Sequence, residues 1–145
     1  MPASGIKLAD ANVWLALAYS GHVHHASART WFDAQANDSC AFCRITQLAL
    51  LRHLTNAKIM GPFVQSQQQA WAAYDSLNSD PRATFLPEPS ILESEFRNLS
   101  QSSSPAHQQW TDAYLAAFAK LNSAVLVTFD RGFGSFVGLD LVILA

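Results

Sequence analysis

The sequence predicts an α/β protein of three layers, in which helices cover both faces of a mainly parallel, roughly five-stranded central sheet. Short apolar runs of strand length alternate with longer stretches in which apolar residues recur at helical spacing. The run AVLVTF at 124–129 is apolar without alternation, as strands buried on both faces are. Alternation of strands with helices favours a parallel sheet with helices on both sides. The 145 residues suffice for one core, so we expect a single domain over 1–145.

The expected elements follow one another along the whole chain. Strands are expected at 5–9, 39–43, 83–87, 124–129 and 139–145. The third of these is stopped by Pro87 and Pro89 and is therefore expected at an edge of the sheet. Helices are expected at 13–19, 25–35, 45–54, 66–77, 90–100 and 110–122. The serine- and glutamine-rich segment 100–109 is expected to be a mobile surface loop.

Composition narrows the class of protein. Half of the residues are hydrophobic and 14% are charged, which excludes a disordered chain and favours a globule that keeps apolar surface for a second copy or a protein partner. The formal net charge of −2 means that any RNA must be held locally. No apolar stretch reaches membrane-spanning length and the N-terminus does not resemble a signal peptide, so we expect a cytoplasmic protein without membrane contact.

Three aspartates are expected to meet at one edge of the sheet. Asp10 follows the first strand, Asp130 follows the strand at 124–129, and Asp112 lies in the first turn of a helix. The carboxyl ends of parallel strands and the N-termini of the helices after them share an edge, where ligands of open α/β sheets bind. Gln47, in the first turn of the third expected helix, should reach the same place.

Each aspartate also has an ordinary structural explanation. Asp10 can cap the following helix, Asp112 can favour the helix dipole behind a Thr111 cap, and Asp130 can begin a turn. Together, however, carboxylates about 4 Å apart repel by roughly 4 kcal/mol at an effective dielectric near 20. A hard divalent cation, Mg²⁺ or alternatively Mn²⁺, would neutralise them and suits phosphodiester hydrolysis by an activated water.

At these residues the chain resembles the PIN-domain ribonuclease toxins of VapBC-type toxin–antitoxin systems. The similar segments are LADANVWLAL, CRITQLALLRHLTNAKIMG, WTDAYLAAFAK and LVTFDRGFGSFVGLDLVIL, which together span most of the chain. The resemblance implies a PIN-like fold and a Mg²⁺-dependent endoribonuclease that cuts tRNA or rRNA, dimerises with itself and is silenced by a cognate antitoxin. It implies that the metal-binding acids are Asp10, Asp112 and Asp130, and that Asn12 and Thr128 are polar groups beside the metal.

The sequence departs from that family pattern at two positions. Many PIN domains carry a glutamate where this chain has Gln47, and many carry another aspartate where it has Gly132. An amide oxygen can still serve the catalytic site, but it binds a cation more weakly than a carboxylate does. A related branch of the family, with ITQ followed by LR, shares this glutamine, so the resemblance favours an active enzyme that includes Gln47 in its catalytic set. A catalytically silent module that binds RNA or protein stays open as the alternative.

Other residues carry weaker signals. Arg44, Arg52 and Arg131 are the basic residues nearest in sequence to the acidic edge and are expected to contact RNA phosphates, although each can equally be a solvated surface arginine. The pair Cys40 and Cys43 matches a redox motif, but packing in a buried strand is the more ordinary role. The histidines of GHVHH at 21–25 are expected on a loop and helix start, and the four tryptophans mainly in the core or in interfaces.

Overall fold

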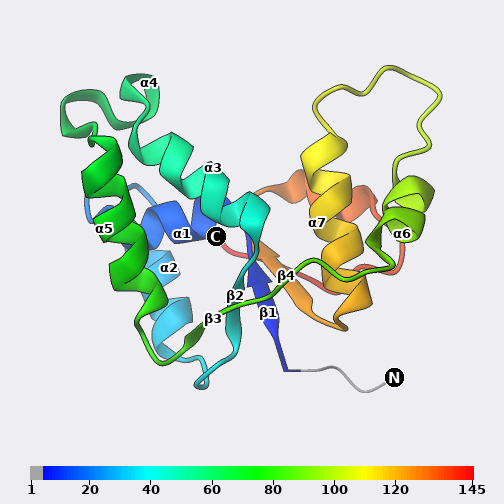
Figure 1. Ribbon diagram of the computed structural model, residues 1–145, viewed down its shortest axis with the longest axis horizontal. Helices are drawn as coiled ribbons and strands as arrows, with labels where there is room; N and C mark the ends of the chain where they lie inside the picture. The colour runs from blue at the N-terminus through cyan, green and yellow to red at the C-terminus, as the bar shows by residue number, and fades with distance from the viewer. Residues whose placement is uncertain (1–4) are drawn as a thin grey trace.

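A computed structural model of the protein describes residues 5–145 and contains a five-stranded sheet that is parallel throughout (Figure 1). The strands lie in the order β3-β2-β1-β4-β5. Their bounds are β1 Lys7–Ala9, β2 Cys40–Phe42, β3 Ala83–Phe85, β4 Val125–Thr128 and β5 Leu141–Ile143. The expected fold class is thus confirmed, and β3 is an edge strand as its prolines predict.

Four longer helices cover one face of the sheet, on the side where Figure 1 labels α1, α2, α3 and α5. Trp14 is the centre of this core, because it stacks on Phe42 of β2 at 3.8 Å between ring centroids and meets the edge of Phe32 at 5.9 Å. The helices are α1 Ala11–Ala18, α2 His25–Asp33, α3 Arg44–Leu54 and α5 Gln67–Asn78.

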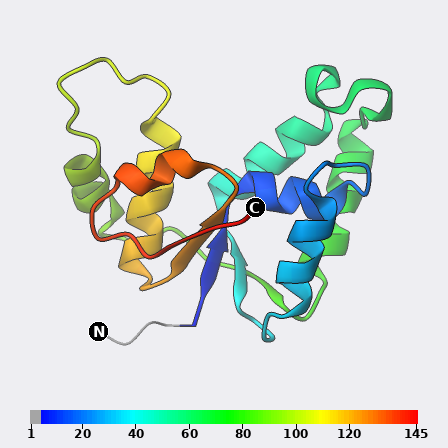
Figure 2. The same ribbon diagram turned by 180° about the vertical axis from the view of Figure 1, so that it is seen from behind.

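The opposite face is covered by α6 Leu92–Leu99, α7 Trp110–Leu121 and the 3₁₀ helix η2 Arg131–Ser135. Successive residues of β4 point to opposite faces of the sheet, since Leu126 packs in this second core and Val127 packs in the first. From behind, Figure 2 shows the C-terminal segment running beside β4, with which β5 pairs. The strands β1, β2 and β4 are therefore largely buried on both faces, as the lack of alternation at 124–129 predicts for β4, whereas Val142 and Ile143 of the edge strand β5 are exposed.

The chain between α3 and α5 holds two short helical turns that the sequence interpretation missed. They are α4 Ala57–Met60 and the 3₁₀ helix η1 Gly61–Phe63. The side chain of Asn56 caps α4 by accepting the N–H of Lys58 at 2.9 Å, and Gly61 ends it with a φ of 55°. Among residues 5–145, no helix is both long and apolar enough to cross a membrane.

The strand ends decide where polar side chains gather. In Figure 1 the arrowhead of β1 and the first turn of α7 lie at the same side of the sheet. The loop 100–109 contains no helix or strand, as expected, and leads into that first turn. Side chains at the ends of β1 and β4 and at the start of α7 therefore lie together at the edge of the sheet that the carboxyl ends of its strands form.

Candidate active site

Asp10 lies at this edge, where β1 ends and α1 begins. Its backbone N–H donates to the carbonyl of Val127 at 2.8 Å, and its Oδ1 accepts the N–H of Ala11 at 2.7 Å, which caps α1. Burial raises the pKa of Asp10, and the negative charge of Asp130 raises it further. Hydrogen bonds from Thr128 and Ala11 oppose this shift. The capping role and an electrostatic role beside a second acid therefore coexist in one side chain.

Thr128 and Asn12, which the family resemblance implies as polar groups beside the metal, form a hydrogen-bonded group with Asp10. The fully buried Thr128 donates through Oγ1 to Oδ2 of Asp10 at 2.9 Å. Asn12 donates from Nδ2 to the same Oγ1 at 3.2 Å, and its Oδ1 accepts the N–H of Phe129 at 3.3 Å. These bonds fix the direction of the Asp10 carboxylate and the path of the chain after β4.

Asp130 is exposed and begins η2, in the turn that the sequence predicts. Its N–H donates to Oγ1 of Thr128 at 3.0 Å, and its Oδ1 accepts the N–H of Gly132 at 2.8 Å. A Cβ atom on residue 132 would lie only 3.1 Å from that Oδ1. Gly132, one of the two departures from the family pattern, therefore leaves room for this orientation of Asp130.

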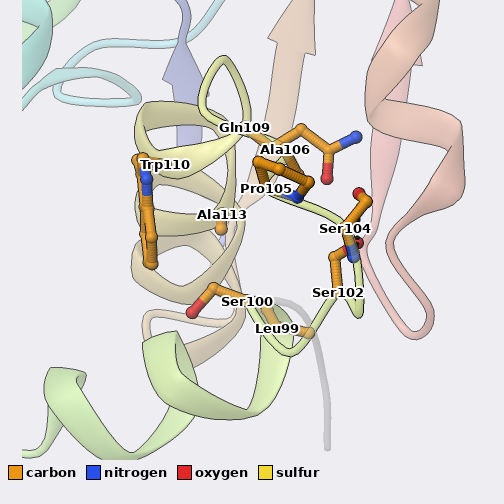
Figure 3. A pocket seen from close by; sticks show the side chains of 9 residues that line it. All are labelled: Leu99, Ser100, Ser102, Ser104, Pro105, Ala106, Gln109, Trp110 and Ala113. Atoms are coloured by element: carbon orange, nitrogen blue, oxygen red, sulfur yellow. Dashed lines mark hydrogen bonds between the residues drawn. The ribbon is translucent and has the colours of Figure 1, made fainter.

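Asp112 reaches the edge from the first turn of α7, but the expected cap is wrong. The helix begins at Trp110, so Thr111 lies inside the first turn, and the residue before the helix, Gln109, makes no side-chain cap. Beside this end of α7, the serine-rich loop curves from Leu99 back to the helix and leaves a pocket of about 70 Å³ (Figure 3). That volume suits a few waters and not a nucleotide.

The three aspartates are close enough to influence one another. Burial raises the pKa of Asp112 to about 6, and the charges of Asp10 and Asp130 are its further causes. No hydrogen bond within residues 5–145 offsets that shift at Asp112. A carboxyl group left without a donor beside two others is expected to attract a cation when it ionises.

The oxygen atoms of the three aspartates suit a hard cation that keeps several waters better than one enclosed entirely by protein ligands. Among residues 5–145, no three His, Cys, Asp or Glu side chains are arranged to hold a metal ion by themselves. Mg²⁺, however, is usually bound through one or two carboxylates and keeps several waters. Asp112 accepts no hydrogen bond in the described chain, and each of the other two acids retains free lone pairs, so the oxygen donor set fits such an ion.

Gln47 is buried in α3, and its contacts lie outside the acidic group. Its Oε1 accepts from Nη1 of Arg44 at 2.6 Å, and its side chain also hydrogen-bonds Tyr74 of α5. The guanidinium of Arg44 lies 4.9 Å from the ring centroid of Phe85, at the end of β3. Sequence reasoning missed Tyr74 and Phe85, because no local motif marks a side chain whose partner comes from another layer.

The other basic and histidine residues are placed as follows. Arg52 and Arg131 are exposed and make no ion pair within the described chain. His24 lies just before α2 and stacks on Phe129 at 4.4 Å between ring centroids, next to Asp130 in sequence. That contact was also missed, since the GHVHH segment by itself does not indicate which strand end it meets.

The two cysteines cannot work as a dithiol pair in this fold. Cys40 packs in the core that α1, α2, α3 and α5 cover, whereas Cys43 packs in the core that α6, α7 and η2 cover, on opposite faces of the sheet. Both are free, and burial raises the pKa of each thiol. Packing, the more ordinary of the two expected roles, is therefore what the structure supports.

The comparisons with known proteins agree with this geometry. A model of the PIN domain family matches residues 7–138. Ribonuclease VapC41 of Mycobacterium tuberculosis is 44% identical over 143 residues, which cover 95% of this chain and 98% of the relative. Ribonuclease VapC29 of the same organism is 34% identical and covers 90% of each chain. The chain therefore belongs to the PIN-domain family and, within it, to the VapC group, as the resemblance implied.

Solved structures share the fold at low sequence identity. VapC20 of Mycobacterium tuberculosis, described as a sarcin-ricin loop cleaving toxin, matches with a TM-score of 0.67 at 16% identity, over 92% of this chain and 98% of that one. The DNA-bound VapBC from Salmonella typhimurium matches with a TM-score of 0.67 at 15% identity, over 95% and 97%. These likenesses support the PIN-like α/β/α architecture.

Proposed function

We propose that this chain, a single PIN domain over residues 1–145, is an endoribonuclease toxin that hydrolyses tRNA or rRNA with Mg²⁺ or Mn²⁺. One observation carries the proposal: three carboxylates from distant segments share one sheet edge, where burial and, after it, the charges of Asp10 and Asp130 raise the pKa of Asp112 to about 6. Relatives up to 44% identical are named ribonucleases, which supports the same activity here.

Asp10, Asp112 and Asp130 would hold the cation. A divalent ion bound there supplies charge neutralisation, an acidified water and stabilisation of the phosphate charge in the transition state. Thr128 and Asn12 keep Asp10 in place through the bonds at 2.9 Å and 3.2 Å. A held carboxylate loses less conformational entropy when the ion binds, so these two residues favour binding without contacting the ion.

Arg44, Arg52 and Arg131 are proposed to bind RNA phosphates around the acidic edge. The net charge of −2 gives no long-range attraction, so capture depends on such local cations. None of the three forms an ion pair within residues 5–145, whereas Arg29, Arg82, Arg97 and Lys120 do. Guanidinium groups without carboxylate partners are free to pair with phosphates.

Two protein partners are proposed, a second copy of the chain and a cognate antitoxin. Exposed apolar side chains lie on the neighbouring elements α3, α4, η1 and α5 and on the residue directly after η1, which makes this the surface we assign to the homodimer. They are Leu48, Ile59, Phe63, Val64 and Trp71. Solved VapBC complexes share the fold and contain an antitoxin, which supports an antitoxin partner here.

Cleavage of total RNA by the purified chain, freed of any partner, tests the function. We expect discrete products with Mg²⁺ or Mn²⁺, none in EDTA, and none from Asp112→Asn. Asp38→Asn is the matched control, because it makes the same chemical change before β2, at the end of the sheet where the strands begin. Its φ of 57° suits asparagine. Intact RNA from folded, metal-supplied protein would instead favour a silent binding module.

A further inference from the structure

The start of α3 holds a side-chain group that the acidic edge does not use. Arg44 and Gln47 are three residues apart, hence on the same face of the helix. Nη1 of Arg44 donates to Oε1 of Gln47 at 2.6 Å, and the guanidinium lies over the ring of Phe85 at 4.9 Å. A long, exposed side chain is thereby held at two points, which lowers its freedom before any ligand arrives.

The environment of Gln47 leaves it little scope for another role. The residue is 7% exposed, its Oε1 is occupied by Arg44, and its side chain also hydrogen-bonds the hydroxyl of Tyr74. Tyr74 is itself held in the core, with its ring 4.9 Å from that of Phe42. No hydrogen bond within residues 5–145 joins Gln47 to any of the three aspartates.

The neutrality of Gln47 matters for the charge of Arg44. Other fixed cations in the described chain are compensated, as Arg82 is by Asp80 at 2.9 Å and Lys120 is by Glu95 at 2.9 Å. The guanidinium of Arg44 donates a hydrogen bond to Gln47 but has no carboxylate within ion-pair distance. A glutamate at position 47 would hold the guanidinium equally well and would neutralise it.

Arg44 also lies at the edge where the acids are. It directly follows Cys43, which comes after β2, the strand that pairs with β1. Asp10 and Arg44 therefore follow neighbouring strands at the same edge of the sheet, and Arg44 offers a pre-oriented, uncompensated guanidinium to a further phosphate of an RNA that is bound at the aspartates.

We infer that Gln47 is a positioning residue, which holds Arg44 for an RNA phosphate while leaving its charge intact, and that Gln47 does not bind the metal. The inference rests on the proposed ribonuclease function and refines it. It reassigns the amide at the position where many PIN domains carry a glutamate: the side chain serves substrate capture through Arg44.

The substitution Gln47→Glu separates the two roles, because they predict opposite results. A metal-binding role predicts tighter Mn²⁺ binding and faster cleavage when a carboxylate replaces the amide. The positioning role predicts weaker binding of RNA, a raised KM, an unchanged kcat and unchanged Mn²⁺ affinity. The probe is fluorescein-labelled bulk tRNA in EDTA, followed by fluorescence anisotropy over a range of KCl concentrations, with kinetics in Mg²⁺ alongside.

We expect Arg44→Gln to weaken tRNA binding roughly tenfold and to lower the slope of log affinity against log salt by about 0.7–0.9, the value for one phosphate contact. Gln47→Glu should shift both in the same direction, and the double variant should bind no more weakly than Arg44→Gln alone. Arg97→Gln removes the same charge from an exposed pair on α6 and should leave the slope unchanged.

Three outcomes would overturn the inference. They are unchanged tRNA binding by Gln47→Glu, additive losses in the double variant, and tighter Mn²⁺ binding by Gln47→Glu. Arg44 is exposed, so Arg44→Gln keeps the test valid even if a change at the buried position lowers stability. If the unaltered chain neither binds nor cuts RNA, the proposed function itself fails, whereas RNA binding that is indifferent to these variants overturns only the role of Gln47.

Discussion

Thr128 donates a hydrogen bond of 2.9 Å to Oδ2 of Asp10 and so joins the ends of β4 and β1, 118 residues apart in sequence. The same hydroxyl accepts the N–H of Asp130 at 3.0 Å. One buried side chain thus orients two of the three acids at the candidate active site. The geometry of the acidic edge depends on this threonine as well as on the carboxylates themselves.

Replacing Thr128 with valine should therefore affect both stability and metal binding. Valine keeps the shape but leaves Asp10 and the N–H of Asp130 without their shared partner, so we expect the free energy of unfolding to fall by about 1–3 kcal/mol. Mn²⁺ affinity, measured by calorimetry, should fall with it. Thr128→Ser retains the hydroxyl and should stay near the unaltered protein in urea unfolding; equal losses in both variants would contradict the assigned role.

Asp112 should destabilise the metal-free protein above its pKa. Its pKa is raised from 3.8 to about 6, so the folded state holds the proton more tightly than the unfolded chain and stability falls as pH rises between these values. In EDTA at about pH 7.5, Asp112→Asn should therefore raise the free energy of unfolding. We expect about 1 kcal/mol, reduced from a full ~3 kcal/mol because the half-buried group is screened by water.

The pH dependence of that difference is its check. Near pH 3.5 the carboxyl is largely protonated in both states, so urea unfolding should show the variant and the unaltered protein to be nearly equal. A stabilisation by Asp112→Asn that persisted unchanged at this pH would show that the cause is not the raised pKa.

Divalent metal should reverse the order of stability expected in EDTA, because it should stabilise the unaltered chain and not a variant that lacks one of the acids. An ion at ten times its dissociation constant stabilises the folded state by about 1.4 kcal/mol, and only a protein with the acids intact gains this. We expect Mg²⁺ to raise the melting temperature of the unaltered chain and of Asp38→Asn, but not that of Asp10→Asn. Thermal scans in EDTA and in Mg²⁺ measure the effect; an equal shift in all three proteins would place the binding elsewhere.

Two tryptophans provide a test of the core. Trp14 is fully buried between Phe32 and Phe42, whereas Trp110 is 55% exposed. Trp14→Ala should lower the free energy of unfolding by about 3–5 kcal/mol, and Trp110→Ala by roughly 1 kcal/mol or less. Denaturant unfolding followed by circular dichroism compares them, and a smaller loss at Trp14 than at Trp110 would refute the assignment of this core.

The proposed dimer surface is open to a direct test. Phe63 on η1 is 62% exposed and Trp71 on α5 is 47% exposed. Introducing charge at both positions should therefore lower the stability of the fold little, but should strongly destabilise an apolar interface. We expect the unaltered chain to sediment as a dimer and Phe63→Glu with Trp71→Glu to sediment as a monomer at the same concentration. A dimer that survives both changes would move the interface to another face.

Most of the fold could be predicted because its signals are local. Apolar periodicity located all five strands and six of the seven α-helices of residues 5–145 within a few residues, and proline marked β3 as an edge strand. The misses are short: α4 and η1 depend on the cap of Asn56 and on a glycine with positive φ, and α7 starts without the expected threonine cap. Such details depend on only one or two residues, which carry no periodicity.

The sequence by itself determined the order of the elements, the two-faced burial of β4 and the presence of three acids after β1, after β4 and in α7, because residue type and spacing act along the chain. Only the tertiary structure decided that Gln47 contacts Arg44 and Tyr74 and not those acids. The direction of a side chain depends on how its helix is rotated against neighbours from distant segments. Sequence spacing does not contain that rotation; the packing of α3 against α1 and α5 sets it.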